Sequence, residues 1–430
     1  MILAKNRLAA GWECQQRGEL DNAQAIYRSV IRDFPSKPEP WIYLGMCLND
    51  QTHYHEALAA YQRALVKVPD NENALVNRGV TLGMLGRYQD AINSHLEAIS
   101  LMPNHARAHT NLGIELLRAC QSEERESAKW QKAWSEYRWR IKTAVFTPPN
   151  YLAPFWQGEA LAGKHLIIHG EQGLGDEIQT SRYVNELRRQ AKKITLAADR
   201  KLNSLFIRSF PDIDVVERGE SLPDADYQVC AFNLPLYFGH GQAQPYLSAD
   251  PHNRRKWASD LANMQGPKIG ICWTGNPQNP MNSLRSIPFS MLISALGQHC
   301  SNLVSLQTAL HQEETSTLPD TITIYAPVAA PNHTEQPRSI DEMASIISCL
   351  DLVISCDSLS AHLAGGLGVE TWLLLAAVPD WRWGLDTTSS KWYQHHRLFR
   401  QTKMGDWRDV CSSLSDAMND FNDKFANLHI

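Results

Sequence analysis

The chain has 430 residues, of which 43% are hydrophobic and 20% charged, so it forms two or three folded domains and is not disordered. A net charge of −5 argues against general binding to nucleic acid or anionic lipid, so any anion site must be local. Nine scattered cysteines without a C-x-x-C argue against a disulfide framework and a zinc site. The start lacks the apolar core of a signal peptide and no apolar run is long enough to span a bilayer, so we expect a cytoplasmic protein.

The first third of the chain contains an internal repeat with a period of 34 residues. Three residue types share this period, and a partly kept aromatic position follows it. They are the glycines Gly11, Gly45, Gly79 and Gly113, the alanines Ala23, Ala57 and Ala91, the prolines Pro35, Pro69 and Pro103, and the ring positions Tyr27, Tyr61 and His95. The pattern resembles the tetratricopeptide repeat, in which small residues lie where two helices approach and proline ends the second helix. We therefore expect an α-solenoid over residues 1–140.

An aromatic segment follows the last repeat. Trp130, Trp134 and Tyr137 have the spacing i, i+4, i+7 and would share one face of a helix. Such a stripe would suit either an aromatic ligand site or a capping helix that packs the repeats onto the next domain. We favour the capping helix, because aromatic stripes at helical spacing are usually core.

The remaining two-thirds alternates apolar, β-branched runs with helix-like segments, which predicts an α/β region with two parallel sheets. The second sheet would begin at "KIGICWTGN", residues 268–276. Two open α/β units of this kind bind ligands at the carboxyl ends of their strands. Strands are expected in 164–170, 193–198, 213–218, 227–232, 268–275, 302–307, 322–327, 351–357 and 372–378, and helices in 176–191, 200–209, 253–264, 288–299, 340–350 and 359–367.

The turn "HGEQGLGDEIQT", residues 169–180, joins a strand to a helix and carries three glycines. Its spacing is G-x-x-G-x-G, so it matches neither the dinucleotide fingerprint nor the Walker motif. Glycines at a strand–helix turn allow a ligand to approach the backbone closely. Asp176 would begin the helix, either as a capping residue or as a catalytic carboxylate.

Several motifs in fixed order support a family resemblance: "HGEQGLGDEIQTSRY", "WTGNP", "LRSIP", "VSLQ", "LDLVISCDSLSAHLAGGLG", "PDWRWGLD" and "WYQHHRLFRQ". Together they resemble bacterial glycosyltransferases related to the lipopolysaccharide heptosyltransferases, in the branch that carries N-terminal tetratricopeptide repeats. Some proteins of that branch glycosylate flagellin. The resemblance implies an α + α/β protein in which a solenoid precedes a GT-B fold of two facing Rossmann-like domains.

The resemblance assigns roles to particular residues. Sugar transfer needs a base for the acceptor hydroxyl and stabilisation of the departing phosphate. Asp176 matches the proposed base, and Glu171 is its rival or an acceptor-binding group. The expected donor-binding residues are Gly173, Gly175, Trp273, Asn276, Arg285, Gln307, Asp357, Ser358, Ser360, His362, Trp381 and Arg382. Two positions depart from the family pattern in the phosphate-binding segment: Leu359 replaces its Gly and Ala361 its Ser.

Simpler alternatives remain for several of these residues. Asp357 to Ser360 would also suit an ordinary helix cap, His362 a buried core histidine and Arg285 a surface arginine. The two tryptophans of "PDWRW" would equally anchor a loop. The Asp-x-Asp sequences at 212–214 and 224–226 are interpreted as turn acids, because the relatives hold phosphates without metal.

We therefore expect a metal-independent, inverting glycosyltransferase that takes a nucleotide-sugar as co-substrate and needs no further cofactor. The repeats would recruit a protein acceptor, with flagellin the first to test. The alternatives are a lipopolysaccharide or glycan acceptor, and an inactive repeat scaffold. The expected domains are the repeats at 1–140, an acceptor domain at 141–265, a donor domain at 266–404 and a helical tail at 405–430.

Overall fold

A computed structural model divides the chain into two compact units. Unit 1 comprises Met1–Pro148 together with Asp380–Gly384, and unit 2 comprises Pro149–Pro379 and Leu385–Ile430. The structure describes residues 2–147, 149, 151–297, 299–307, 318–319, 321–326, 339–385 and 388–428. No helix among them combines the length and apolar character needed to cross a membrane.

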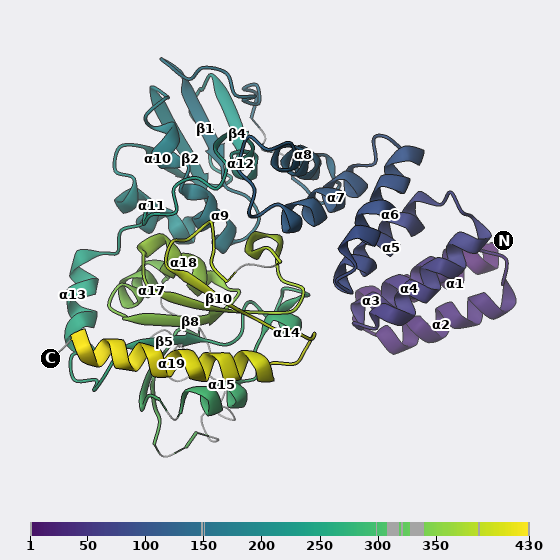
Figure 1. The fold of residues 1–430 in the computed structure, drawn as a ribbon. Helices are drawn as coiled ribbons and strands as arrows, with labels where there is room; N and C mark the ends of the chain where they lie inside the picture. The colour runs from purple at the N-terminus through teal and green to yellow at the C-terminus, as the bar shows by residue number, and fades with distance from the viewer. Residues whose placement is uncertain are drawn as a thin grey trace. The chain divides into compact units, whose positions relative to one another are not determined.

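Unit 1 is a series of helical hairpins, as the 34-residue period predicts (Figure 1). Within a hairpin, the ring of the second helix lies on the glycine of the first: a Cβ at Gly11 would be 2.5 Å from Tyr27, and one at Gly45 2.6 Å from Tyr61. Glycine is therefore required by space at this repeat position. The helices are α1 (Ile2–Gln16), α2 (Leu20–Asp33), α3 (Glu39–Asp50), α4 (Tyr54–Lys67), α5 (Glu72–Met84), α6 (Tyr88–Leu101), α7 (Ala106–Ala119) and α8 (Ala128–Tyr137).

The third hairpin replaces the buried tyrosine by a histidine. In the first hairpin, the Tyr27 hydroxyl donates to the side chain of Gln15. In the second hairpin, the Tyr61 hydroxyl accepts from the side chain of Asn49. The equivalent amide position in the third hairpin is Gly83, where a side chain would collide with Glu115. The ring of His95 is fully buried against Gly79, and neither of its nitrogens bonds to a described residue. Burial, together with nearby Arg107 and Arg78, lowers the pKa of His95 to about 3.

We expect His95→Phe to stabilise unit 1 most at acidic pH. The imidazole is neutral in the folded chain down to about pH 3, whereas an unfolded histidine takes up a proton below about pH 6.5. The contribution of His95 to the free energy of unfolding is therefore kept above pH 6.5 and falls as the pH drops towards 3. The loss is about 2 kcal/mol between pH 7 and pH 5. Urea unfolding at pH 8 and pH 5 should show that the free energy of unfolding decreases less in the variant than in the wild type. An equal loss in both proteins would contradict the assignment.

The aromatic segment after the repeats is buried core, as the helical spacing predicts. Trp134 packs edge-on against Trp381, with ring centroids 5.3 Å apart, and Tyr137 lies 5.9 Å from the same ring. The short 3-10 turn Trp381–Trp383 is thus part of unit 1, although the preceding strand belongs to unit 2.

Unit 2 contains two wholly parallel sheets, which confirms the α/β prediction. The four-stranded sheet has the order β3-β2-β1-β4, and the six-stranded sheet β10-β9-β8-β5-β6-β7. In each sheet the chain starts centrally, winds to one edge and then reverses, so switch points lie between β1 and β4 and between β5 and β8. The strands are β1 (His165–His169), β2 (Lys193–Ala198), β3 (Asp214–Glu217), β4 (Tyr227–Cys230), β5 (Ile269–Cys272), β6 (Asn302–Ser305), β7 (Thr323–Tyr325), β8 (Leu352–Cys356), β9 (Thr371–Leu375) and β10 (His396–Arg400).

Helices cover both faces of the six-stranded sheet (Figure 1). On one face, α15 and α19 lie side by side and bury Leu292, Leu296 and Leu414 against the strands. On the other face, α18 packs on β8 and β9, and α17 packs on α18 and α13. The helices of unit 2 are α9 (Leu174–Ser181), α10 (Val184–Leu187), α11 (Asn203–Ser209), α12 (Pro235–Phe238), α13 (Pro251–Asp260), α14 (Asn282–Arg285), α15 (Phe289–Leu296), α17 (Ile340–Ile347), α18 (Leu359–Leu367) and α19 (Arg408–Leu428).

Contacts between α9 and α18 join the two sheets of unit 2. Arg182, at the end of α9, is only 2% exposed. Its guanidinium donates to the Trp392 carbonyl and to the Tyr246 hydroxyl, and it lies 4.5 Å from the centre of the Tyr393 ring. None of the described carboxylates pairs with it. We call this group of contacts the α9–α18 seam.

Candidate functional site

The turn between β1 and α9 places Asp176 at the start of a helix. The Asp176 carboxylate accepts a hydrogen bond of 2.8 Å from the backbone N–H of Gly173, so the capping interpretation holds at the level of geometry. Gln172 has a φ of 64°, in the left-handed region that a residue with a side chain rarely adopts. Such strained turns cluster at functional sites. Asp176 is half-buried, so its carboxylate reaches the surface while it is held.

Two further carboxylates lie near this turn, Glu171 at the switch point between β1 and β4 and Glu177 towards the ends of β2 and β3. Glu171 accepts a 2.9 Å hydrogen bond from the N–H of Phe232, which follows β4, so it joins the ends of β1 and β4. Glu177 accepts from the Asp199 N–H at 2.8 Å and lies 3.2 Å from the guanidinium of Arg218. Burial raises the pKa of Glu177 to about 7. Glu177 directly follows Asp176 but belongs to none of the sequence-selected site residues.

The switch point of the six-stranded sheet is lined by thiol, amide and hydroxyl groups. Cys272, at the end of β5, donates to the Gln307 side-chain oxygen at 2.9 Å and lies 3.5 Å from the Ser358 hydroxyl. Ser358 in turn lies 2.9 Å from the Ser355 hydroxyl. Hydrogen bonding, first with Cys356, holds the pKa of the Cys272 thiol below its usual value. The structure thus brings together Gln307 and Ser358, which sequence reasoning selected, with Cys272, which it did not.

Arg285 lies over the end of β5 at the same switch point. Its Nη2 is 2.7 Å from where a Cβ of Gly275 would be, so glycine lets the guanidinium rest on the backbone. Its Nε is buried and makes no hydrogen bond to any residue that the structure describes. Beside it, Thr274 and Ser286 share a 2.8 Å hydrogen bond between their hydroxyls. This cluster offers a cation and hydroxyls to an anionic ligand.

Helix α18 starts at the switch point and meets the first turn of α9. Ser358 is its N-cap, Ser360 is buried in its first turn, and Asp357 is half-buried. A Cβ at Gly175 would lie 2.8 Å from Cδ2 of His362. The α9–α18 seam therefore brings the Asp176 turn next to the "DSLSAH" segment. The sequence predicted the catalytic base in the first motif and phosphate binding in the second.

Other selected residues lie elsewhere. The Trp273 ring is 2% exposed in the core, 4.7 Å from the Phe289 ring, so it supports the end of β5 from inside. Asn276 is exposed and accepts from the Gln278 N–H. Trp381 is buried in unit 1, and Arg382 pairs with Asp380 at 2.6 Å. These contacts give Trp381 and Arg382 an anchoring role; a ligand role stays a prediction.

The two Asp-x-Asp sequences are engaged in surface ion pairs. Asp212 pairs with Arg188 at 2.7 Å and Asp226 with Lys164 at 2.9 Å. Within the described ranges, no group of three or more His, Cys, Asp or Glu side chains could hold a metal ion.

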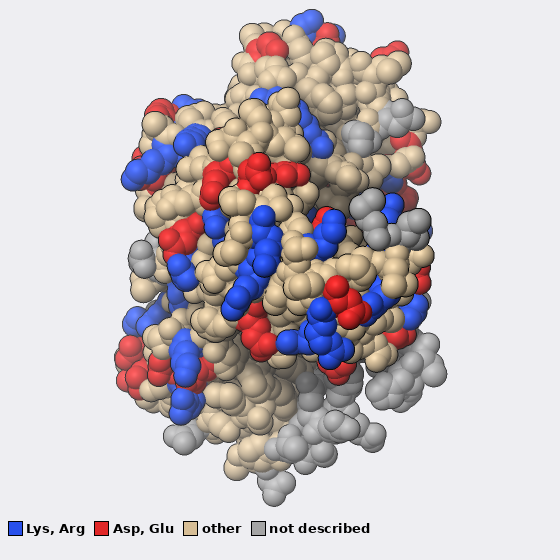
Figure 2. Space-filling model, turned by 90° about the vertical axis from the view of Figure 1, so that its right-hand side faces the viewer, with Lys and Arg blue, Asp and Glu red and all other residues tan. Residues whose placement is uncertain are grey.

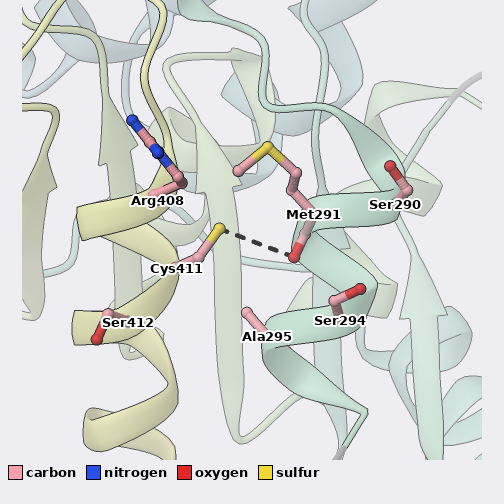
Figure 3. Close-up of a pocket in the computed structure, with 7 residues that line it drawn as sticks. All are labelled: Ser290, Met291, Ser294, Ala295, Arg408, Cys411 and Ser412. Atoms are coloured by element: carbon pink, nitrogen blue, oxygen red, sulfur yellow. Dashed lines mark hydrogen bonds between the residues drawn. The ribbon is translucent and has the colours of Figure 1, made fainter.

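On the face shown in Figure 2, the charges of the described residues form no extended basic area. On the side shown in Figure 2, basic and acidic side chains are interspersed among larger uncharged areas. One hollow of about 410 Å³ lies between α15 and α19 (Figure 3). It is lined by Ser290, Met291, Ser294, Ala295, Arg408, Cys411 and Ser412. None of these residues belongs to either switch point.

Comparison with known proteins identifies the repeats. Residues 8–72 and 50–100 match the tetratricopeptide repeat family. The chain is 26% identical over 316 residues to Protein FlbA of Caulobacter vibrioides, covering 67% of this chain and 52% of that protein, so it spans about half of the relative's length.

Two similar solved structures each cover about a third of the chain. MamA of Desulfovibrio magneticus RS-1 is 23% identical and covers 31% of this chain and 73% of its own, with a TM-score of 0.28. PilF of Pseudomonas aeruginosa is 24% identical and covers 33% and 62%, with a TM-score of 0.29. Scores this low support no functional assignment. The repeat match and the two parallel sheets show that the chain has N-terminal tetratricopeptide repeats followed by an α/β region.

Proposed function

We propose that this protein is a glycosyltransferase of GT-B architecture that moves a sugar from a nucleotide-sugar to an acceptor. The observation that supports this most is the seam contact of Gly175 with His362. It sets a turn rich in carboxylates beside a helix start rich in hydroxyls, each at the switch point of its own sheet. Ligands of open α/β sheets bind at such points.

The proposed roles follow from chemistry. Asp176 takes the proton from the acceptor hydroxyl, and Glu171 fixes the turn through the Phe232 N–H. The start of α18, with Ser358 and Ser360, holds the donor phosphates together with Arg285, and these groups stabilise the charge of the leaving group. A base on the face opposite the leaving phosphate would invert the anomeric centre.

A repeated row of side chains supports a protein acceptor. One position after each repeat glycine, the first helix of every hairpin carries an apolar side chain. These residues are Trp12, Met46, Val80 and Ile114. Trp12 is 37% exposed and Val80 36%, while the other two are half-buried. An apolar row along successive repeats offers a surface to a polypeptide. Flagellin in the cytoplasm is the acceptor to test first, on the resemblance alone.

Two assays test the proposal. The purified full chain is incubated with a panel of nucleotide-sugars, and release of the nucleotide is followed with and without flagellin. Intact-mass spectrometry then compares cellular flagellin in strains with and without this protein. We expect a sugar mass that disappears with the protein. Nucleotide release without any change in flagellin would favour a glycan acceptor, and no release with any donor would favour a scaffold.

A further inference from the structure

Tyr393 lies in the α9–α18 seam and contacts the imidazole of His362 directly. Its hydroxyl is 2.8 Å from Nδ1 of His362, and the side chain is 1% exposed. The residues are 31 positions apart, and Tyr393 lies in the segment just before β10. Nothing in the sequence motifs points to this pair.

The phenol ring is fixed on several sides. It is seated on the backbone of α18 at Gly365, where any Cβ would collide with the ring. It stacks on His396 at 4.6 Å between centroids, and the guanidinium of Arg182 lies 4.5 Å from its centre. A ring held in this way presents its hydroxyl in one direction. Burial raises the pKa of Tyr393 well above its usual range, so the hydroxyl keeps its proton.

The opposite edge of the His362 imidazole faces the first turn of α9, which carries Gly175 and Asp176. A Cβ at Gly175 would lie 2.8 Å from Cδ2 and 3.5 Å from Nε2 of His362. Gly175 immediately precedes Asp176. The Tyr393 contact at Nδ1 therefore fixes which edge of the imidazole meets the first turn of α9.

We propose that Tyr393 is a positioning residue that donates its hydroxyl proton to Nδ1 of His362 and so keeps the ring proton on Nε2. Nε2–H, on the edge that faces α9, then donates to the phosphate oxygen that gains charge as the sugar leaves. A neutral imidazole has one donor and one acceptor nitrogen, so donation from the Tyr393 hydroxyl to Nδ1 requires the ring proton to be on Nε2. This role rests on the proposed transferase function.

The test replaces the hydroxyl but keeps the ring. Tyr393→Phe is compared with Tyr183→Phe, a buried tyrosine of the same region whose hydroxyl donates to the Gly239 carbonyl at 2.6 Å. Histidine is labelled with ¹⁵N in the full chain, and His362→Gln assigns the His362 signals. At pH 8 we expect the wild type to show a protonated Nε2 and an unprotonated Nδ1, and Tyr393→Phe to show a mixture of tautomers.

Kinetics give the second readout. Tyr393→Phe should lower kcat about tenfold and leave the donor KM within about twofold, whereas Tyr183→Phe should change neither. A wild-type His362 with its proton on Nδ1, or tautomers unchanged in Tyr393→Phe, would overturn the positioning role. If the wild type transfers no sugar from any donor, the proposed function is overturned instead. The contact between Tyr393 and His362 would then have no catalytic role, even if the spectra show the expected tautomer.

Discussion

Asp176→Asn should lower the rate of sugar transfer at least about a hundredfold while donor binding is kept. An amide cannot take the acceptor proton, but its oxygen can still accept the hydrogen bond from the Gly173 N–H that starts α9. The fold of the turn is therefore preserved and the proton acceptor is removed. The measurement is kcat of transfer beside the dissociation constant of the donor.

Asp250→Asn is the matched control for this change. Asp250 caps α13 by accepting from the N–H groups of His252 and Asn253, away from both switch points. The control should keep wild-type turnover and a similar melting temperature. Turnover that survives in Asp176→Asn would transfer the role of base to another carboxylate, and Glu171→Gln is the next variant to measure.

Arg285→Ala should weaken donor binding roughly ten- to a hundredfold, as expected for loss of a hydrogen bond to a charged group. The guanidinium lies on Gly275 at the end of β5, and its removal leaves the hydroxyls of Thr274 and Ser286 paired with each other. Local structure should thus be kept. Titration with the nucleoside diphosphate of the preferred donor measures the effect.

Two companion variants make this result specific. Arg285→Lys keeps the charge but loses the planar fork, so its affinity should lie between those of the wild type and Arg285→Ala. Arg408→Ala removes an arginine that lines the hollow between α15 and α19 and should leave affinity unchanged (Figure 3). A loss confined to Arg408→Ala would move the nucleotide to that hollow and away from the switch point.

The fold was predictable where burial is regular. Nine expected strands are present as β1 to β9. Most of them are buried on both faces and form continuous apolar runs, whereas β3 and β7 are only partly buried. β10 was missed, since "HHRLFR" mixes basic and apolar residues at the sheet edge. The prediction of one continuous helix over 176–191 is wrong, because α9 ends at Ser181 and a second helix, α10, begins at Val184. Arg182, between them, turns inward to bond the Trp392 carbonyl.

The site was predictable only one motif at a time. Strand–turn–helix patterns selected Asp176 and Ser358, because turns after parallel strands meet at one edge of a sheet, whereas the family resemblance selected Arg285. The partners of these residues come from distant segments: Glu171 meets Phe232, and His362 meets Tyr393. The aromatic loop at 381–383 had two equal interpretations, and only tertiary contact with Trp134 shows its packing. Pairings of this kind depend on packing that no local pattern encodes.

The buried guanidinium of Arg182 also constrains motion. Pulling the two sheets of unit 2 apart at α9 and α18 would leave this cation without the Trp392 carbonyl, the Tyr246 hydroxyl and three aromatic rings at once. Water would have to replace all of them in a single step. The two sheets are therefore expected to stay in contact at Arg182 if they move relative to each other.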